Sequence, residues 1–249
     1  MQKRSGRKFL FPNEPPPTVR AVRARHAVVL RGNFPLMPAI PQGVTVVEHP
    51  LVRVMLTRLR DERTEPGEFR ARLAELAAML VTEATRDLAT RPCHVRTPLD
   101  DYEGAALARP VVLVPILRAG LGMIDGMLRV LPGASVGHIG MRRDEKTHRP
   151  ACYYFNLPPH FSQADVIVVD PMLATGHSAS EAIAKLKEAG ARSIRFLCVV
   201  SCPEGLAQIR SAHPDVPVFT AAVDERLNEK AYIVPGLGDA GDRCFGTFE

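Results

Sequence analysis

The stretch from Asp170 to Ser178 combines an acid, two hydroxyl side chains and small residues in an order that could bind a sugar beside an anion. A buried apolar run precedes it and an amphipathic segment follows, so we expect a strand, a turn and a helix. Backbone N–H groups in such a turn converge with the helix N-terminus and bind anions. Thr175 and Ser178 would add hydroxyl donors, and Asp170 would accept hydrogen bonds from sugar hydroxyls. Taken alone, the stretch also fits an ordinary α/β connection in which Asp170 only caps a helix.

A second anion-binding pattern follows another apolar run, Val111 to Val114. The run continues into PILRAGLG at 115–122, which places an arginine and two glycines at the end of a predicted strand. Arg118 would supply a formal positive charge to an anion, and Gly120 would allow a tight turn. The alternative is an exposed Arg118 beside plain turn glycines.

Two further stretches could contact a ligand. A charged run, Arg142-Arg143-Asp144-Glu145-Lys146, is predicted as a hairpin or flexible loop between strands at 135–141 and 151–155. Such a run by itself is more typical of a solvated surface. The glycine-dense segment 231–243 would let the backbone approach a flat ring that offers alternating carbonyl acceptors and an N–H donor.

The glycine-dense segment contains a formal G-x-G-x-x-G at 236–241, but a dinucleotide fold is excluded. Only eight residues follow Gly241, which leaves no room for the helix, second strand and ribose-binding acid of that fold. The chain also lacks the G-x-x-x-x-G-K-[ST] pattern, so we do not expect a P-loop kinase.

The elements around these stretches alternate regularly between strand and helix. Val166 to Val169 is predicted as a strand buried on both faces, followed by a helix that buries Ile183 and Leu186 and stops near Gly190. The alternation continues with a strand, a helix and a strand, at 193–200, 203–212 and 216–222. The predicted fold class is therefore α/β with a mostly parallel sheet covered on both sides, and its ligands should bind at the C-terminal ends of the strands.

Before the first anion-binding pattern, the chain is predicted to be mainly helical. A short strand at 44–48 precedes a helix at 51–61. A longer helix after Pro66 carries apolar residues at four-three-four spacing: Phe69, Leu73, Leu76 and Leu80. The segment 91–109 contains proline and aspartate and is predicted to be irregular.

The net charge of +5 belongs to the N-terminal part of the chain. Residues 1–43 hold eight Lys or Arg and one acid, so the other 24 basic and 26 acidic residues sum to −2. We therefore divide the chain into a basic, Pro-rich arm (1–43) and a folded domain (44–249), and expect the arm to be disordered or loosely docked. The arm lacks the long apolar segment of a secretory signal. An organellar presequence and transient attachment to nucleic acid stay open as alternatives.

The remaining composition is that of a globular protein in a reducing compartment. No run of about eighteen uncharged apolar residues occurs, so no membrane span is expected. Five cysteines without metal-type spacing argue against a disulfide scaffold or zinc site. We predict a cytoplasmic location.

Four segments together resemble uracil phosphoribosyltransferase, a type I phosphoribosyltransferase family. They are PILRAGLG at 115–122, the Arg-Arg-Asp-Glu at 142–145, DPMLATG at 170–176 and YIVPGLGDAGDR at 232–243. Their order and spacing match the family, and the similarity covers residues 44–249. The resemblance implies a type I phosphoribosyltransferase-like α/β domain with a smaller hood or arm, here carrying an N-terminal extension. It also implies the reaction of pyrimidine salvage in which uracil and phosphoribosyl pyrophosphate give UMP and pyrophosphate.

The resemblance also implies roles for individual residues. The catalytic residues would be Arg118, Asp170 and Asp239. Phosphoribosyl pyrophosphate would be bound by these three and by Arg143, Pro171, Met172, Leu173, Ala174, Thr175, Gly176, His177 and Ser178. Uracil would be bound, largely through backbone atoms, by Ile233, Gly238, Asp239 and Ala240. Closure of the 142–155 loop would exclude water.

The implied cofactor is Mg²⁺, bound mainly through phosphoribosyl pyrophosphate, with no protein side chain assigned as a metal ligand. The family suggests a homodimer or higher homo-oligomer, and because some members respond to GTP, GTP is a candidate effector. No membrane partner is expected, and nucleic acid is not favoured.

One departure from the family lies in the phosphate loop, where His177 replaces a second glycine. We expect its side chain to point to solvent, while a hydrogen bond to phosphate stays the alternative. A different class of function also stays open: a non-catalytic regulator that senses phosphoribosyl pyrophosphate and binds RNA through the basic arm.

Overall fold

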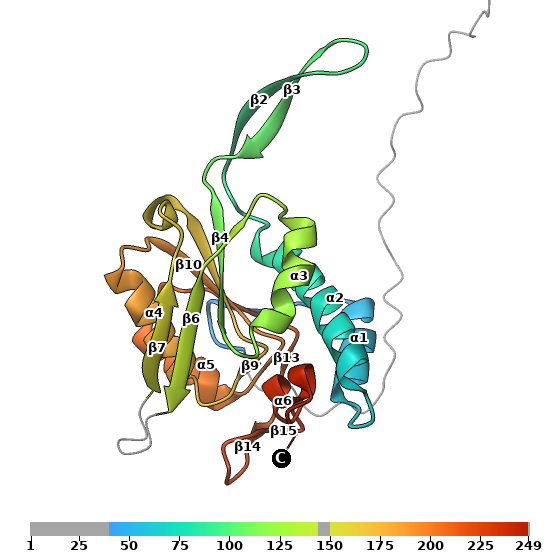
Figure 1. Ribbon diagram of the computed structural model, residues 1–249, viewed down its shortest axis with the longest axis vertical. Helices are drawn as coiled ribbons and strands as arrows, with labels where there is room; N and C mark the ends of the chain where they lie inside the picture. The colour runs from blue at the N-terminus through green and yellow to red at the C-terminus, as the bar shows by residue number, and fades with distance from the viewer. Residues whose placement is uncertain (1–39, 144–149, 249) are drawn as a thin grey trace, which may run out of the picture. The chain divides into compact units, whose positions relative to one another are not determined.

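A computed structural model describes residues 40–143 and 150–248 of the chain (Figure 1). Most of the predicted N-terminal arm and the centre of the predicted charged loop, 144–149, lie outside the described residues. The division at residue 43 therefore stays a prediction.

The described residues form six α-helices, one short 3₁₀ helix and fifteen strands. The helices are α1 (Pro50–Arg60), α2 (Pro66–Ala84), α3 (Leu121–Val130), α4 (His177–Glu188), α5 (Pro203–Ala212) and α6 (Ala240–Phe245), and the 3₁₀ helix is η1 (Phe161–Gln163). The strands are β1 (Val44–Val46), β2 (Thr90–Arg96), β3 (Asp101–Leu107), β4 (Val111–Leu117), β5 (Ser135–Val136), β6 (His138–Arg143), β7 (Pro150–Asn156), β8 (Asp165–Val169), β9 (Met172–Leu173), β10 (Ser193–Leu197), β11 (Val200–Ser201), β12 (Val218–Thr220), β13 (Ala222–Val223), β14 (Arg226–Leu227) and β15 (Ile233–Val234).

A mostly parallel sheet forms the centre of the fold. Its strand order is β1-β12-β10-β8-β4-β6-β7, and β5 also pairs with β4. Every pairing is parallel except that of β6 with β7. The predicted α/β fold class is confirmed, and β4 and β8, whose ends carry the two anion-binding patterns, are neighbours in the middle of the sheet.

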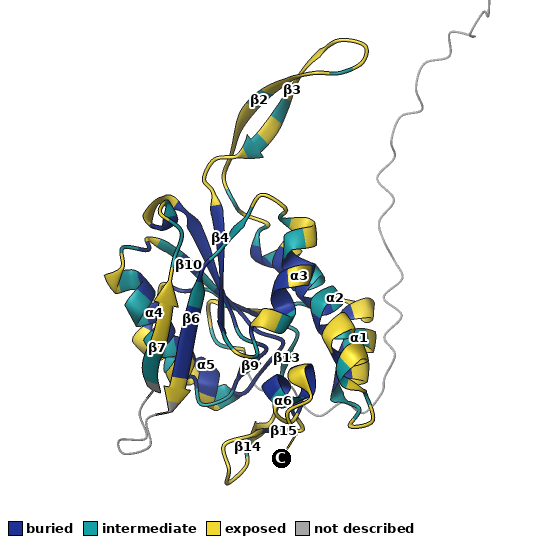
Figure 2. Cartoon of the chain, in the orientation of Figure 1, coloured by how far each residue is buried: buried dark blue, intermediate teal, exposed yellow. Residues whose placement is uncertain are grey.

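Successive residues of the central strands point into two different hydrophobic cores. In β4, Val111 and Leu113 pack in the core that contains α1, α2 and α3, whereas Val112 and Val114 pack in the core that contains α4 and α5. Figure 1 shows these two groups of helices on opposite sides of the sheet. This double burial explains why the central strands are continuous apolar runs. In Figure 2, β4 and β10 are dark blue along most of their length.

Helix α2 buries the apolar positions that its sequence spacing predicts. Phe69, Leu73, Leu76 and Leu80 are fully buried. Each such side chain contributes about 1.5–3 kcal/mol by leaving water. Within the described ranges, neither α2 nor any other helix has the length and apolar character to cross a membrane.

The prediction of an irregular segment at 91–109 is wrong. Residues in this range form the antiparallel hairpin β2–β3, closed by Thr97, whose hydroxyl accepts hydrogen bonds from the backbone N–H groups of Leu99 and Asp100. Every residue of both strands is exposed or half-buried (Figure 2). Because neither face of the hairpin is buried, the sequence carries no apolar alternation that would reveal a strand.

Two predicted strands are each broken in the structure. The strand expected at 193–200 ends at Leu197 and resumes as β11, and the one expected at 216–222 is divided into β12 and β13. The second pieces join β9 in a small parallel sheet, β13-β11-β9. Because β9 directly precedes the predicted phosphate loop (174–178), this small sheet holds the backbone that leads into the loop.

Candidate active site

Turns from three parts of the chain meet at the C-terminal edge of the central sheet. A methyl group built on Gly120 would lie 2.6 Å from the Val169 carbonyl oxygen, so the turn after β4 lies directly against the end of β8. A methyl group built on Gly241 would lie 3.1 Å from the Asp239 carboxylate and 3.8 Å from the Arg118 guanidinium. The segments that hold Arg118, Asp170 and Asp239 are therefore brought together, and the strand topology predicted this for the first two.

The predicted phosphate loop ends in an open helix N-terminus. Gly176 has a φ of +79° and precedes α4, and no side chain caps that helix. His177 and Ser178 are exposed and Thr175 is half-buried, and no hydrogen bond from either hydroxyl is found among the described residues. An exposed His177 agrees with the expectation that it points to solvent. The first amides of α4 and two hydroxyls are thus placed for an anion.

Backbone contacts hold the segment that leads into this loop. The Pro171 carbonyl accepts hydrogen bonds from Val199 and Val200 at 3.0 Å each, and Met172 and Leu173 form β9. In α5, Gly205 lies so close that an added methyl group would be 2.4 Å from the Ala174 carbonyl oxygen. The loop conformation therefore depends on a glycine outside the loop.

Asp170 is a half-buried carboxyl group at the end of β8. Its Oδ1 accepts a hydrogen bond from the Met172 N–H at 3.3 Å. Burial raises the pKa of Asp170 to about 7, that hydrogen bond lowers it, and the negative charge of Asp239 raises it further. Within the described part of the chain, neither Asp170 nor Asp239 forms an ion pair with a Lys or Arg side chain.

Arg118 has a carboxylate partner that the sequence reasoning missed. Its Nη2 donates to Oδ1 of Asp242 at 3.2 Å, and the pair is partly exposed. Asp242 lies within the YIVPGLGDAGDR segment, but only the folded structure shows which of its two acids faces Arg118.

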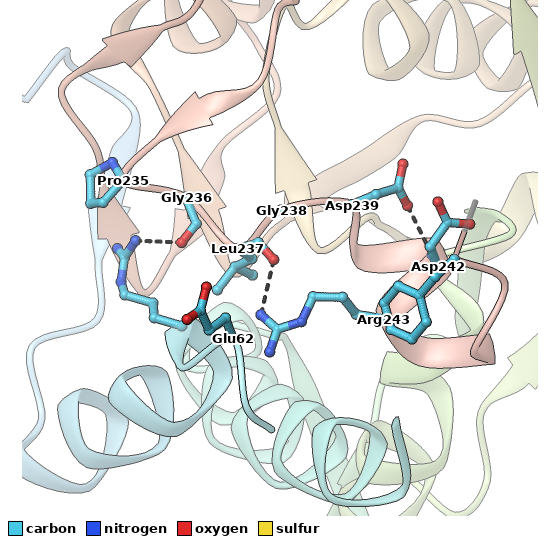
Figure 3. A pocket seen from close by; sticks show the side chains of 10 residues that line it. Glu62, Pro235, Gly236, Leu237, Gly238, Asp239, Asp242 and Arg243 are labelled. Atoms are coloured by element: carbon cyan, nitrogen blue, oxygen red, sulfur yellow. Dashed lines mark hydrogen bonds between the residues drawn. The ribbon is translucent and has the colours of Figure 1, made fainter. Parts of the chain in front are cut away.

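The predicted uracil residues fall into two groups. Gly238 and Asp239 line a pocket of about 370 Å³, shared with Pro235, Gly236, Leu237 and Asp242 (Figure 3). Ile233 and Ala240 are almost fully buried and pack in the core instead. Their role in binding uracil stays a prediction. Asp239 also caps α6, because its carboxylate accepts from the Asp242 N–H at 2.9 Å.

Arg143 is the predicted site residue about which the structure says least. Its backbone ends β6, and its side chain is outside the described residues, as is the 144–149 part of the predicted closing loop. Its role in binding pyrophosphate stays a prediction.

Comparison with known proteins identifies the family. The uracil phosphoribosyltransferase family matches residues 46–247. The uracil phosphoribosyltransferase of Dictyoglomus turgidum is 53% identical over 205 residues, which cover 82% of this chain and 99% of that protein. That of Salinibacter ruber is 53% identical over 208 residues, covering 84% of this chain and 99% of that protein. In structure, the AQ2163 protein of Aquifex aeolicus superposes with a TM-score of 0.78 at 37% identity, over 82% of this chain and 98% of the other. The chain belongs to the uracil phosphoribosyltransferase family.

Proposed function

We propose that this protein transfers the phosphoribosyl group of phosphoribosyl pyrophosphate to uracil, giving UMP and pyrophosphate. The observation that carries the proposal is the meeting of Arg118, Asp170 and the 235–240 loop at one edge of the sheet. Two relatives that are about half identical to this chain are named uracil phosphoribosyltransferase, and the similarity extends over nearly their whole length. They give no support to the alternative of an RNA-binding regulator.

The anionic substrate would lie across the two turns that follow β4 and β8. The open N-terminus of α4, with Thr175 and Ser178, would bind the 5′-phosphate. Asp170 would accept hydrogen bonds from the ribose hydroxyls, and Arg118 would hold the pyrophosphate together with Arg143. To hold pyrophosphate, Arg118 must give up or share its ion pair with Asp242. Because both side chains are partly exposed, losing this ion pair costs little free energy.

Uracil would be bound by backbone groups of the glycine loop. Gly238 and Asp239 lie outside helices and strands, and the described residues provide no acceptor for either backbone N–H group. These amides are free to donate to the carbonyl oxygens of a flat ring. Ile233 and Ala240 would complete the site from the core side.

The proposed chemistry needs no protein nucleophile. As the bond from C1 to pyrophosphate breaks, positive charge develops on the ribose; N1 of uracil bonds to that carbon and gives up its proton to the leaving pyrophosphate or to water. Arg118 would stabilise the negative charge of the leaving group, while Asp170 and Asp239 would face the positive charge on the ribose. Asp170 can do so only when it is ionised. With a pKa of about 7 the group is only partly ionised near neutral pH, and a nearby cation would favour its charged form.

The residues at the site fit a Mg²⁺ ion that arrives with the substrate. Asp170 and Asp239 are two carboxylates whose charges disfavour each other, a situation that a cation relieves. Over residues 40–143 and 150–248, no three His, Cys, Asp or Glu side chains form a closed metal site. Mg²⁺ usually takes one or two carboxylates and completes its shell with phosphate oxygens and water. When bound, it would neutralise charge on the pyrophosphate.

We also propose a homodimer or higher homo-oligomer. The β2–β3 hairpin carries exposed apolar side chains, among them Val95, Leu99 and Tyr102, that a second copy of the chain could cover. GTP remains a candidate effector on the family expectation alone. A cytoplasmic location is supported by five free cysteines.

A base panel tests the proposed function. UMP, identified as the product, should form from uracil, while cytosine, orotate and hypoxanthine give little or no nucleotide. Turnover of another base in preference to uracil would overturn the substrate assignment. Binding of phosphoribosyl pyrophosphate without turnover of any base would overturn the enzymatic one.

A further inference from the structure

The loop proposed to bind uracil is held by charged side chains from two distant parts of the chain. Gly236 has its N–H bonded to Oδ2 of Asp224 at 2.8 Å and its carbonyl bonded to Nη1 of Arg60 at 2.9 Å. Figure 3 shows the bond to this carbonyl at one end of the pocket. Both polar groups of one residue are thus fixed by side chains 12 and 176 positions away.

Arg60 and Asp224 also bind each other. The guanidinium and carboxylate form two parallel hydrogen bonds of 2.8 and 2.6 Å. Asp224 is only 6% exposed, and Arg60 is 24% exposed. A buried, two-pronged pair of this kind is geometrically strict and among the stronger interactions in a protein. Together with Gly236 the pair forms a closed ring of four hydrogen bonds, which we name the loop clamp.

A second arginine fixes the next residue of the loop. Arg243, which is 8% exposed, donates to the Leu237 carbonyl at 3.0 Å and to the Leu59 carbonyl next to Arg60 (Figure 3). Its guanidinium lies 4.4 Å above the centre of the Phe69 ring. The carbonyls of Gly236 and Leu237 are therefore both hydrogen-bonded to buried or half-buried arginines, which fixes the orientation of these two peptide groups.

The residues just after Leu237 have backbone N–H groups without a hydrogen-bond acceptor in the described part of the chain. Gly236 and Gly238 adopt φ values of +61° and +71°, which orient the intervening peptides. The N–H groups of Gly238 and Asp239 are among those of this loop for which the described residues provide no acceptor. The clamp thus ends two residues before the amides assigned to uracil.

We propose that Arg60 and Asp224 are positioning residues that set the affinity and selectivity for uracil without touching it. This proposal rests on the proposed function, since it concerns the same loop. When backbone amides bind a ring, the directions of their N–H bonds decide which base fits. The Arg60–Asp224 pair would fix these directions. Among the described residues, Arg60 and Asp224 form no hydrogen bond or ion pair with Arg118, Asp170 or α4, so we expect the main effect on the base.

The test uses Arg60→Lys and Asp224→Asn, with Arg63→Lys as the matched control. Arg63 forms a similar two-pronged pair with Asp61 at 3.0 and 2.8 Å, but it is 85% exposed and has no bond to the loop. We expect each clamp variant to raise KM for uracil about tenfold or more and to lower the preference for uracil over cytosine, because a charge-assisted hydrogen bond is lost. KM for phosphoribosyl pyrophosphate should change less than about twofold in both, and the control should match the wild type.

The double variant Arg60→Lys/Asp224→Asn adds a second criterion. If the pair acts as one unit, its KM for uracil should be close to that of the more affected single variant. A multiplicative effect would contradict joint action. An unchanged KM for uracil in either folded single variant, or an equal rise in both substrates' KM values, would reduce the clamp to a structural role and overturn the inference. A wild-type protein that does not use uracil would instead refute the proposed function.

Discussion

Asp242 joins the proposed pyrophosphate arginine to the proposed uracil loop. Its Oδ1 lies 3.2 Å from Nη2 of Arg118, and its backbone N–H donates to the Asp239 carboxylate at 2.9 Å. Two segments more than a hundred residues apart in sequence are thereby coupled at the point where the two substrates would meet.

Arg118→Gln should separate activity from stability. The ion pair with Asp242 is 56% and 29% exposed, so its loss should change the free energy of unfolding by less than about 1 kcal/mol. The value of kcat/KM for phosphoribosyl pyrophosphate should fall about 100-fold, because the leaving group loses a charged donor. Steady-state UMP formation and urea unfolding measure the two quantities. Arg86→Gln, which removes an exposed arginine paired with Glu83 at the end of α2, should leave both unchanged. Equal activity in the two variants would exclude Arg118 from the site.

Gly205→Ala should disturb the phosphate loop from outside. The new methyl group would lie 2.4 and 2.5 Å from the carbonyl oxygens of Ala174 and Leu173, so the loop must move. We expect KM for phosphoribosyl pyrophosphate to rise about tenfold or more, with some loss of stability from overpacking. Gly67→Ala is the control, because its added methyl group meets nothing within 4 Å. Unchanged kinetics in Gly205→Ala would show that the loop tolerates the displacement.

Asp170 should make stability fall as the pH rises. Its pKa is raised by burial from 3.8 to about 7, so between about pH 4 and 7 the folded protein holds a proton that the unfolded chain has released. The free energy of unfolding contributed by this group is then highest near pH 4 and is lost by about pH 7. Asp170→Asn removes this dependence. Urea unfolding of both proteins should show the variant gaining stability relative to the wild type across that window. A constant difference would contradict the raised pKa.

His213 should make stability fall as the pH drops, the opposite of the effect of Asp170. Burial lowers its pKa below 6.5, the Lys187 charge lowers it further, and the Ser180 carbonyl and Asp215 oppose this. The unfolded chain then binds more protons near pH 6.5, so the free energy of unfolding should fall as the pH drops below that value. In His213→Gln, which keeps a polar atom facing Ser180, the fall should be smaller. Thermal unfolding at several pH values measures it, with the exposed His94→Gln as control. An identical acid dependence in all three proteins would refute this role.

The sequence predicted those features that depend on local pattern. Continuous apolar runs identified β4 and β8 because both faces of these strands are buried, and the four-three-four spacing identified α2. The β2–β3 hairpin was missed since neither of its faces is buried in this chain. Nothing local could have revealed the clamp, because Arg60 and Asp224 become partners only when residues 164 positions apart are folded together.

The same distinction applies to the site. Arg118, Asp170 and the glycine loop were predicted because each lies in a compact motif next to a strand. Asp242 lies in the YIVPGLGDAGDR motif, but its pairing with Arg118 arises only in the folded structure. The core positions of Ile233 and Ala240 also depend on packing that spacing does not encode.

The central claim is tested most directly by UMP formation from uracil and phosphoribosyl pyrophosphate with Mg²⁺, in the wild type and Asp170→Asn. Uracil-dependent turnover in the wild type, reduced about 100-fold in the variant at unchanged folding, is the predicted result. A wild type that binds phosphoribosyl pyrophosphate but forms no UMP would contradict the enzymatic assignment. Full activity in Asp170→Asn would contradict the placement of the reaction at the end of β8.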